Sequence, residues 1–145
     1  MTYLLDTNVV SELRRLDRAN ARVVRWFGET SPRFYSISVI TVLELDRGML
    51  RVQRRDPSQG GILRRWIENE VLAGFGDRIL PVNTTIARRT AALHVPDPRP
   101  EVDALIAATA LVHGLTVVTR NTADFEPMGV AVLNPWLENP TQTGA

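Results

Sequence analysis

Cysteine and lysine are absent from this chain of 145 residues, and histidine occurs only at His94 and His113. Without cysteine there can be no disulfide scaffold, thiolate zinc site, iron–sulfur cluster or cysteine nucleophile. Without lysine there can be no Schiff-base chemistry, P-loop ATPase or receiver-type phosphorylation switch. Two histidines are too few for a histidine-rich metal site.

Long hydrophobic runs are also missing. The longest uncharged stretch, Ala104–Thr119, is shorter than the roughly 20 apolar residues of a membrane-spanning helix. No basic region precedes Asp6, which argues against a signal peptide. Hydrophobic residues make up 44% and charged residues 23% of the chain, which is a globular composition for a single domain. We therefore expect a soluble cytoplasmic protein with one domain over residues 1–137 and a flexible tail over residues 138–145.

The charge is nearly balanced, but its distribution is uneven. The chain has 17 basic and 16 acidic residues, and all of the basic residues are arginine. Twelve arginines and nine acids lie in Met1–Leu72, whereas the rest of the chain has five arginines and seven acids. Arginine grips phosphate and carboxylate groups with a planar fork, although a genomic bias towards arginine codons explains the absence of lysine equally well.

Short apolar runs alternate with amphipathic segments along the chain. The runs predict strands at Tyr3–Leu5, Phe34–Ser38, Arg78–Val82, Leu115–Thr119 and Val130–Leu133. The segments between them predict helices over Val9–Leu16, after Asn20, over Val39–Arg55, after Asp56-Pro57, from Asn83 to Leu93, and over Val102–His113. This alternation predicts an α/β fold with a parallel sheet of about five strands that is covered by helices on both faces.

Ligands of such sheets bind at the carboxyl ends of the strands, so acidic residues there are of interest. Asp6 follows the first strand and Asp124 follows the fourth. Asp103 is the only charged residue in Val102–Val112, a segment that is apolar on nearly all sides. Each of these acids also has a structural explanation, as a helix cap, a turn residue or a group stabilised by a helix dipole.

A further acid lies in the helix after the second strand, where Glu44 and Asp46 are both candidates. Helical periodicity places Asp46 within the apolar face and Glu44 at its edge, and it does not choose between them. Acids gathered at one sheet edge repel one another unless a cation compensates their charge. Oxygen-only ligands suit Mg²⁺ or Mn²⁺, and such an ion supports phosphodiester hydrolysis. The residues thus suggest a metal-dependent site that processes phosphate esters.

Four segments in order resemble the motifs of the PIN-domain family, and in particular the VapC toxins of its FitB-like branch. They are Leu4–Glu12, Ser38–Leu45 with Gly48 following, Asp103–Ala110 and Leu115–Asn121. The closing segment Val132–Trp136 also resembles that branch. The resemblance implies a three-layer α/β/α sandwich and an endoribonuclease that depends on Mg²⁺ or Mn²⁺ and uses a metal-activated water.

The resemblance also implies site residues. Asp6, Glu44 and Asp103 match the three core acids of the family, and Asp124 matches a fourth acid that varies more. Asp6 and Asp103 are expected to bind the metal, with Glu44 and Asp124 completing its shell or holding a second ion. The family has varied residues at the position of Asp46, so the resemblance implies no role for this acid.

Other positions are expected to support these acids. Thr7, Asn8 and Thr119 fall at supporting polar positions around them. Four arginines are candidates for contacts with RNA phosphates, although exposed surface explains them equally well: Arg14, Arg15, Arg47 and Arg120.

The implied partners are a VapB-type antitoxin, an RNA substrate and a second copy of the chain in a homodimer. DNA would be bound only through the antitoxin, since nothing here indicates a DNA-binding motif. Two other functions stay open: a non-catalytic partner of the antitoxin that acts in autoregulation, and a PIN nuclease of RNA processing or of structured DNA. A short antitoxin gene next to this one would favour the toxin.

Overall fold

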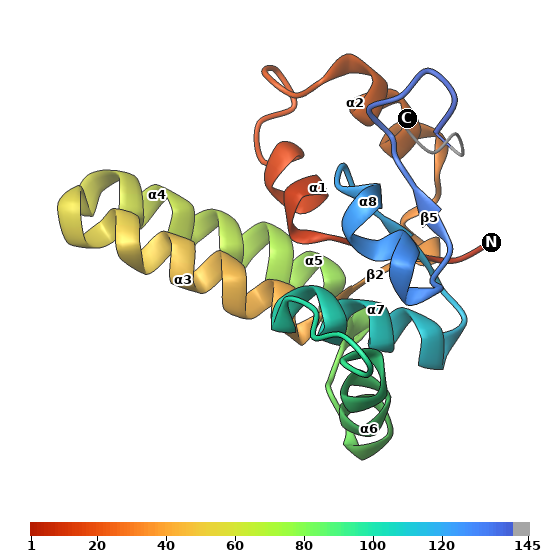
Figure 1. Cartoon of the computed structure of the whole chain (residues 1–145). Coiled ribbons are helices and arrows are strands. Elements are labelled where there is room, and N and C mark those ends of the chain that lie inside the picture. The colour runs from red at the N-terminus through yellow and green to blue at the C-terminus, as the bar shows by residue number, and fades with distance from the viewer. Residues whose placement is uncertain (141–145) are drawn as a thin grey trace.

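The protein is built on an all-parallel sheet of five short strands in the order β3-β2-β1-β4-β5. The structure is a computed structural model that describes residues 1–140 (Figure 1). The strands are β1 (Tyr3–Leu5), β2 (Tyr35–Ser38), β3 (Ile79–Leu80), β4 (Thr116–Val118) and β5 (Val132–Leu133). The predicted parallel sheet of about five strands is confirmed, with β1 at its centre.

Helices fill the connections between the strands. The α-helices are α1 (Thr7–Glu12), α2 (Ala21–Glu29), α3 (Val39–Arg55), α4 (Pro57–Trp66), α5 (Ala73–Phe75), α6 (Thr84–Leu93), α7 (Glu101–His113) and α8 (Thr122–Phe125). A π-helical segment, η2 (Ile67–Leu72), joins α4 to α5, and three short 3₁₀ turns are η1 (Pro32–Phe34), η3 (Gly76–Arg78) and η4 (Glu126–Met128). None of the described helices has the length and hydropathy needed to cross a membrane.

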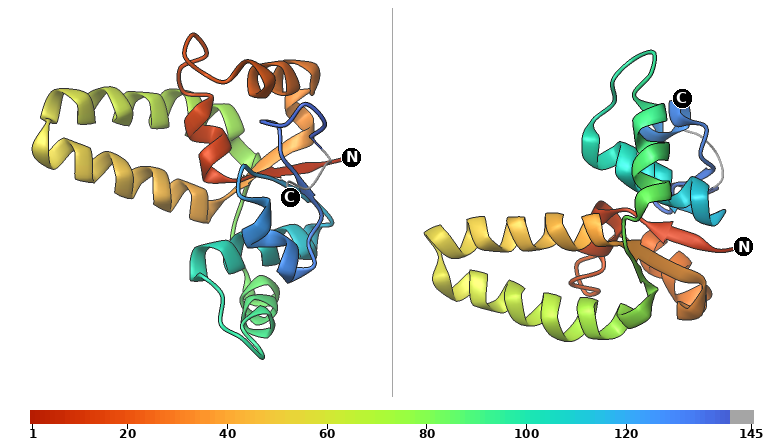
Figure 2. Two further views of the ribbon diagram at one scale, coloured as in Figure 1. Left: turned by 45° about the horizontal axis from the view of Figure 1, so that its top comes forward. Right: turned by 90° about the horizontal axis from the view of Figure 1, so that it is seen from below.

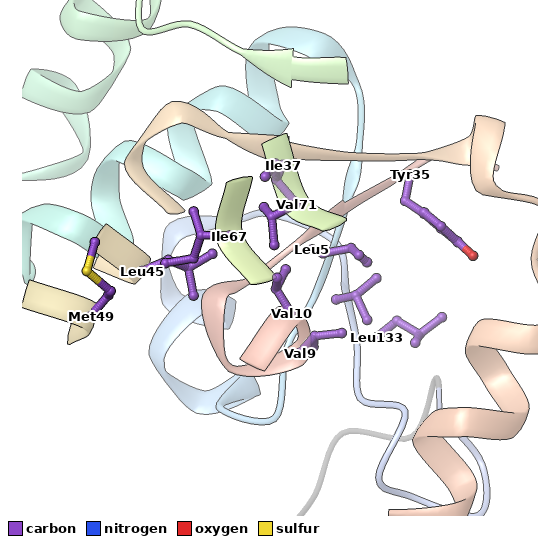
Figure 3. Close-up of a cluster of buried hydrophobic side chains, with 11 residues drawn as sticks. Leu5, Val9, Val10, Tyr35, Ile37, Leu45, Met49, Ile67, Val71 and Leu133 are labelled. Carbon is purple, nitrogen blue, oxygen red and sulfur yellow. The ribbon is translucent and has the colours of Figure 1, made fainter. Parts of the chain in front are cut away.

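The two faces of the sheet support separate hydrophobic clusters. On one face Leu5 and Val118 pack with residues of α1, α3 and η2, in the cluster drawn in Figure 3. On the other face Leu4 and Val117 pack with α7, α8 and η4. Neighbouring strand residues point to opposite faces, so strands covered on both sides are apolar throughout. The expected α/β/α arrangement of three layers is therefore confirmed.

The α3–α4 hairpin extends away from the sheet (Figures 1 and 2). Its helices approach closely at Gly60, where an added Cβ would lie 2.4 Å from the Cα of Gln53. The Gln53 side chain also accepts a 2.9 Å hydrogen bond from the Arg64 guanidinium. Glycine at this position therefore lets the two helices pack together.

Most of the predicted helix starts are confirmed by side-chain caps. Asn20, Ser38, Asp56 and Asn83 each accept hydrogen bonds from backbone amides in the first turn of the helix that follows. The first helix is shorter than predicted and ends at Glu12, because the polar residues after Leu13 have no apolar face to bury. Of the tail predicted over residues 138–145, residues 141–145 lie outside the described part.

Candidate functional site

Asp6 stands at the carboxyl end of the central strand and is only 6% exposed. It caps α1, since its Oδ1 accepts a 2.8 Å hydrogen bond from the backbone amide of Thr7. Its Oδ2 accepts a 2.8 Å hydrogen bond from the Thr119 hydroxyl at the end of β4. The helix cap and the site candidate, which were alternatives at the level of sequence, are the same carboxylate.

Asn8 links Asp6 to the end of β4 from a second direction. Its amide nitrogen lies 3.4 Å from Asp6 Oδ2 and 3.3 Å from the Thr119 hydroxyl. Its amide oxygen accepts a hydrogen bond from the backbone of Arg120. Thr119 in turn accepts a 3.0 Å hydrogen bond from the backbone of Asn121. These bonds hold the loop that leads to Asp124 against the end of β1.

Glu44 reaches the same region from α3, the helix that follows β2. Thr7 donates a 2.5 Å hydrogen bond from its hydroxyl to Glu44 Oε1, and the Thr41 hydroxyl lies 3.1 Å from that of Thr7. Asp46, the other candidate in this helix, is not among the charges that raise the pKa of Asp6 or Asp103. The contact with Thr7 therefore selects Glu44 as the acid that faces the sheet edge.

Asp103 lies in the first turn of α7 and is half-buried. Its pKa is raised from 3.8 to about 6, mainly by burial and then by the charges of Asp6, Asp124 and Glu44, in that order of strength. α7 runs back into β4, so its first turn lies at the same sheet edge as the starts of α1, α3 and α8 (Figure 1). The sheet edge thus brings the four predicted acids within range of one another's charge.

The pKa of Asp6 is raised as well. Burial is the largest cause, and the charges of Glu44 and Asp124 add to it, while the hydrogen bonds from Thr119 and Thr7 act in the opposite direction. Within residues 1–140 the two ion pairs join Arg15 to Asp17 and His94 to Glu101, so neither compensates these acids. The edge of the sheet is a negative site that a bound cation would stabilise.

Comparison with known proteins decides the family. Residues 3–129 match the family model described as the PIN domain. The chain belongs to the PIN-domain family.

Among its relatives, this PIN domain is 38% identical over 139 residues to "Toxin FitB" of Neisseria gonorrhoeae (strain ATCC 700825 / FA 1090), covering 92% of the chain and 97% of the relative. It is 35% identical over 141 residues to "VapC ribonuclease Y4jK" of Sinorhizobium fredii (strain NBRC 101917 / NGR234), covering 92% and 96%. The predicted membership of the VapC toxins, on the side of FitB, is therefore confirmed.

Solved structures agree with this placement. The crystal structure of FitAcB from Neisseria gonorrhoeae matches with a TM-score of 0.84 at 36% identity, covering 93% of this chain and 99% of the other. The structure of FitAB bound to an IR36 DNA fragment matches with a TM-score of 0.85 at 35% identity, covering 94% and 96%. The PIN fold predicted from the motifs is the fold that the chain adopts.

The four arginines proposed for RNA contacts lie in different surroundings in this PIN domain. Arg14 is half-buried beside a cavity that Glu44 also lines, whereas Arg47 is exposed on α3. Arg15 is paired with Asp17 at 3.4 Å. Arg120 is exposed, and its guanidinium lies 5.4 Å from the ring centre of a tryptophan, Trp136. Arg14 and Arg15 also line one cavity together, while the role of all four arginines in RNA contacts stays a prediction.

Two supporting residues were not predicted from the sequence. Thr41 is fully buried beside the Thr7 hydroxyl, and its signal is a hydroxyl on the core face of α3, one turn before Glu44. Asn134 follows β5 and is buried. It donates to the Arg120 carbonyl at 3.3 Å and accepts from the backbone of Trp136 at 2.9 Å, so it fixes the loop after β4.

The donor set agrees with the oxygen ligands that Mg²⁺ and Mn²⁺ prefer. Among residues 1–140, no three His, Cys, Asp or Glu side chains stand close enough together to enclose a metal ion by themselves. Mg²⁺ keeps several of its waters and is usually held by one or two carboxylates, so this PIN domain needs no tighter cage. Four uncompensated acids with oxygen ligands alone fit a hydrated divalent ion.

Proposed function

We propose that this protein is the toxin of a toxin–antitoxin pair and hydrolyses RNA phosphodiesters in a reaction that depends on Mg²⁺ or Mn²⁺. The observation that carries the proposal is the meeting of four acids at the carboxyl edge of the sheet, with raised pKa values at Asp6 and Asp103. The names of the relatives, a toxin and a ribonuclease, support it.

In this proposal Asp6 and Asp103 hold the ion, and Glu44 and Asp124 complete its surroundings. A divalent ion in such a site lowers the pKa of a bound water and polarises a phosphate oxygen. The chain itself supplies orientation. Thr119 fixes one oxygen of Asp6, and Thr7 fixes the carboxylate of Glu44, so both acids present a defined face to the RNA.

The neighbouring acids also have a part in proton transfer. Glu44 and Asp124 lie beside the two carboxylates that hold the ion, so they are the candidates to accept a proton from the attacking water. The RNA backbone approaches the acids from the open side of the sheet edge, because the faces of the sheet are covered by α1 to α5 on one side and by α6 to α8 on the other.

The proposed partners are a VapB-type antitoxin and a second copy of the chain, with DNA bound only through the antitoxin and the complex located in the cytoplasm. The similar solved structures include those of FitAcB and of FitAB, the second bound to a DNA fragment. An apolar cavity of about 680 Å³ between α1, α2 and α4 offers the antitoxin a docking place, with Leu16 exposed at its rim. Co-expression with the product of an adjacent short gene, followed by size determination in solution, tests these assemblies.

The test of the activity is cleavage of total RNA by the antitoxin-free protein. We expect discrete products with Mg²⁺ or Mn²⁺, none with EDTA, and recovery when the metal is added back. Asp103→Asn should abolish the products while the variant stays folded by circular dichroism. A folded wild type that cuts nothing with either metal would instead favour the non-catalytic partner. Cutting that persists in EDTA would exclude the metal mechanism.

A further inference from the structure

The outer part of the α3–α4 hairpin carries a concentrated positive charge. Between Arg47 and Arg65 there are six arginines and a single acid, Asp56. The rest of the chain has eleven arginines and fifteen acids, so the hairpin opposes the charge of the body. Figure 2 shows that this hairpin extends clear of the other helices.

Four of these arginines form a row on α3, defined here as the arginine row: Arg47, Arg51, Arg54 and Arg55. All four are exposed, and none is in the ion pairs found among residues 1–140. Like charges one helical turn apart destabilise a helix, by about 0.2–0.5 kcal/mol per pair. A helix that only needed solubility could avoid this repulsion by alternating acids with the arginines. The row is a surface suited to a polyanion.

The arginine row begins beside the acidic site. At about 100° per residue, its members fall on one side of α3 within an arc of about 100°, and Glu44 lies in the same arc. The buried face of the helix, with Thr41, Leu45 and Met49, is centred about 130° around the helix from the row. From Glu44 to Arg55 the helix rises about 16 Å, and Arg47, Arg51 and Arg55 follow one another at about 6 Å. Their spacing is comparable to that of phosphates in an extended single strand.

The hairpin is rigid enough to hold such a row in place. The close approach at Gly60 and the hydrogen bond from Arg64 to Gln53 fix the two helices against each other at their outer ends. A preorganised row of charges loses less conformational entropy on binding than a flexible basic tail does.

We propose that the arginine row is a backbone track for single-stranded RNA, which leads the strand away from the acids over several nucleotides. This inference rests on the proposed function, because the acids define where the strand starts. The row contacts phosphates and therefore contributes affinity without reading sequence. RNA is favoured over an acidic protein segment because the row continues directly from the site at which the RNA would be cut.

The test is binding of a short single-stranded RNA of mixed sequence to the full antitoxin-free chain in EDTA, measured by fluorescence anisotropy over a series of salt concentrations. The track variant is R47Q/R51Q/R54Q. The matched control, R25Q/R88Q/R89Q, removes the same charge from exposed arginines on α2 and α6. Each lost phosphate contact lowers the slope of log affinity against log salt by about 0.7.

We expect the affinity of the track variant for the RNA to fall about tenfold or more at moderate salt. The slope of log affinity against log salt should become shallower by about 2. The control should change the slope by much less. R47K/R51K/R54K, which keeps the charge, should keep most of the slope. In cleavage assays the track variant should raise KM and leave kcat nearly unchanged.

Equal losses in the track variant and the control would overturn the proposal, because they would show only a general effect of net charge. Unchanged RNA binding together with weaker antitoxin binding would overturn it in favour of a protein-docking surface. If the track variant does not fold, the single substitution R51Q gives the same comparison with R88Q. Since binding is measured without metal, failure of the wild type to cleave RNA would reject the proposed function separately.

Discussion

The carboxyl edge of the sheet and the α3–α4 hairpin meet at Glu44, yet they are stabilised in different ways. The edge gathers four acids whose burial and mutual charge raise the pKa values of Asp6 and Asp103, and hydroxyl donors hold Asp6 and Glu44 in place. The hairpin is stabilised by helix packing around Gly60 and by the hydrogen bond from Arg64 to Gln53, and the four members of the arginine row are exposed. The edge concentrates negative charge that no ion pair within residues 1–140 compensates, whereas the exposed charge of the hairpin is positive. The contrast is between buried acids held by hydrogen bonds and exposed arginines carried by packed helices.

Asp6→Asn should give the largest effect at the edge. Asparagine can still cap α1 through its amide oxygen but cannot supply the negative charge, so we expect RNA cleavage to fall by about 10³-fold or more. Asp46→Asn removes a half-buried acid two residues from Glu44 and is the matched control, with cleavage within a few-fold of wild type. Initial rates with Mg²⁺ measure both. Similar losses in the two variants would mean that net charge, and not the edge, determines activity.

Gly60→Ala tests the packing of the hairpin. The new methyl group would collide with the Gln53 backbone, so we expect the free energy of unfolding to fall by about 1–3 kcal/mol. Gly48→Ala in the same hairpin has no heavy atom within 4 Å of the added Cβ and should stabilise α3 by about 0.5–1 kcal/mol. Urea denaturation gives both values. Effects of the same sign would contradict the assigned contact.

Thr7→Val should remove the hydrogen bond that orients Glu44 while keeping a side chain of nearly the same shape at this position. The Glu44 carboxylate loses the hydroxyl donor at 2.5 Å, and we expect a cost of about 1 kcal/mol in stability and roughly tenfold in cleavage rate. Thr7→Ser keeps the hydroxyl and should restore most of the rate. If valine and serine behave alike, the role of Thr7 is packing and not the orientation of Glu44.

Asp103→Asn should increase the stability of the metal-free protein, in contrast to Thr7→Val. Because the folded pKa is about 6 and the ordinary value is 3.8, the folded state binds more protons between these values, and stability falls as the pH rises through them. Above pH 6 the metal-free wild type therefore carries a penalty that the asparagine variant lacks. Because water screens the half-buried carboxylate, we expect the free energy of unfolding of the variant to exceed that of the wild type by only about 1 kcal/mol.

Thermal unfolding in EDTA at pH 4 and pH 7.5 measures this effect. The variant should be more stable than the wild type at the higher pH, and the two should be nearly equal at the lower pH. A variant that is less stable at both would show that Asp103 is held by favourable contacts instead of being repelled by its neighbours.

Local signals were sufficient for much of the fold. The caps at Asn20, Ser38, Asp56 and Asn83 act within one turn of their own helices, so the sequence contains everything that they need. The strands are continuous apolar runs because both faces of the sheet are covered. Parallel topology then places the ends of β1 and β4 at one edge, which is why Asp6 and Asp124 could be chosen as candidates.

The choice between Glu44 and Asp46 needed the tertiary structure. Periodicity placed Asp46 within the apolar face of α3 and Glu44 at its edge, but both are half-buried in the structure. The contact that separates them comes from Thr7, which is far away in the sequence. Thr41 and Asn134 could not be predicted for the same reason. Thr41 contacts Thr7, and Asn134 contacts the Arg120 carbonyl, and both contacts depend on how the strands are arranged in the sheet. Nor could the sequence separate the exposed arginines of α3 from Arg14, which lies beside a cavity.

The fixed crossing at Gly60 has a consequence for how this arm can change in length. Contacts at Gly60 fix the outer ends of α3 and α4 against each other. An insertion in one helix therefore needs an insertion of equal length in the other to keep these contacts. Seven residues inserted in each would lengthen the arm by about 10 Å and leave its base at the sheet unchanged. Under the proposed RNA binding, the length of the hairpin would set how far from the acids the phosphate contacts extend.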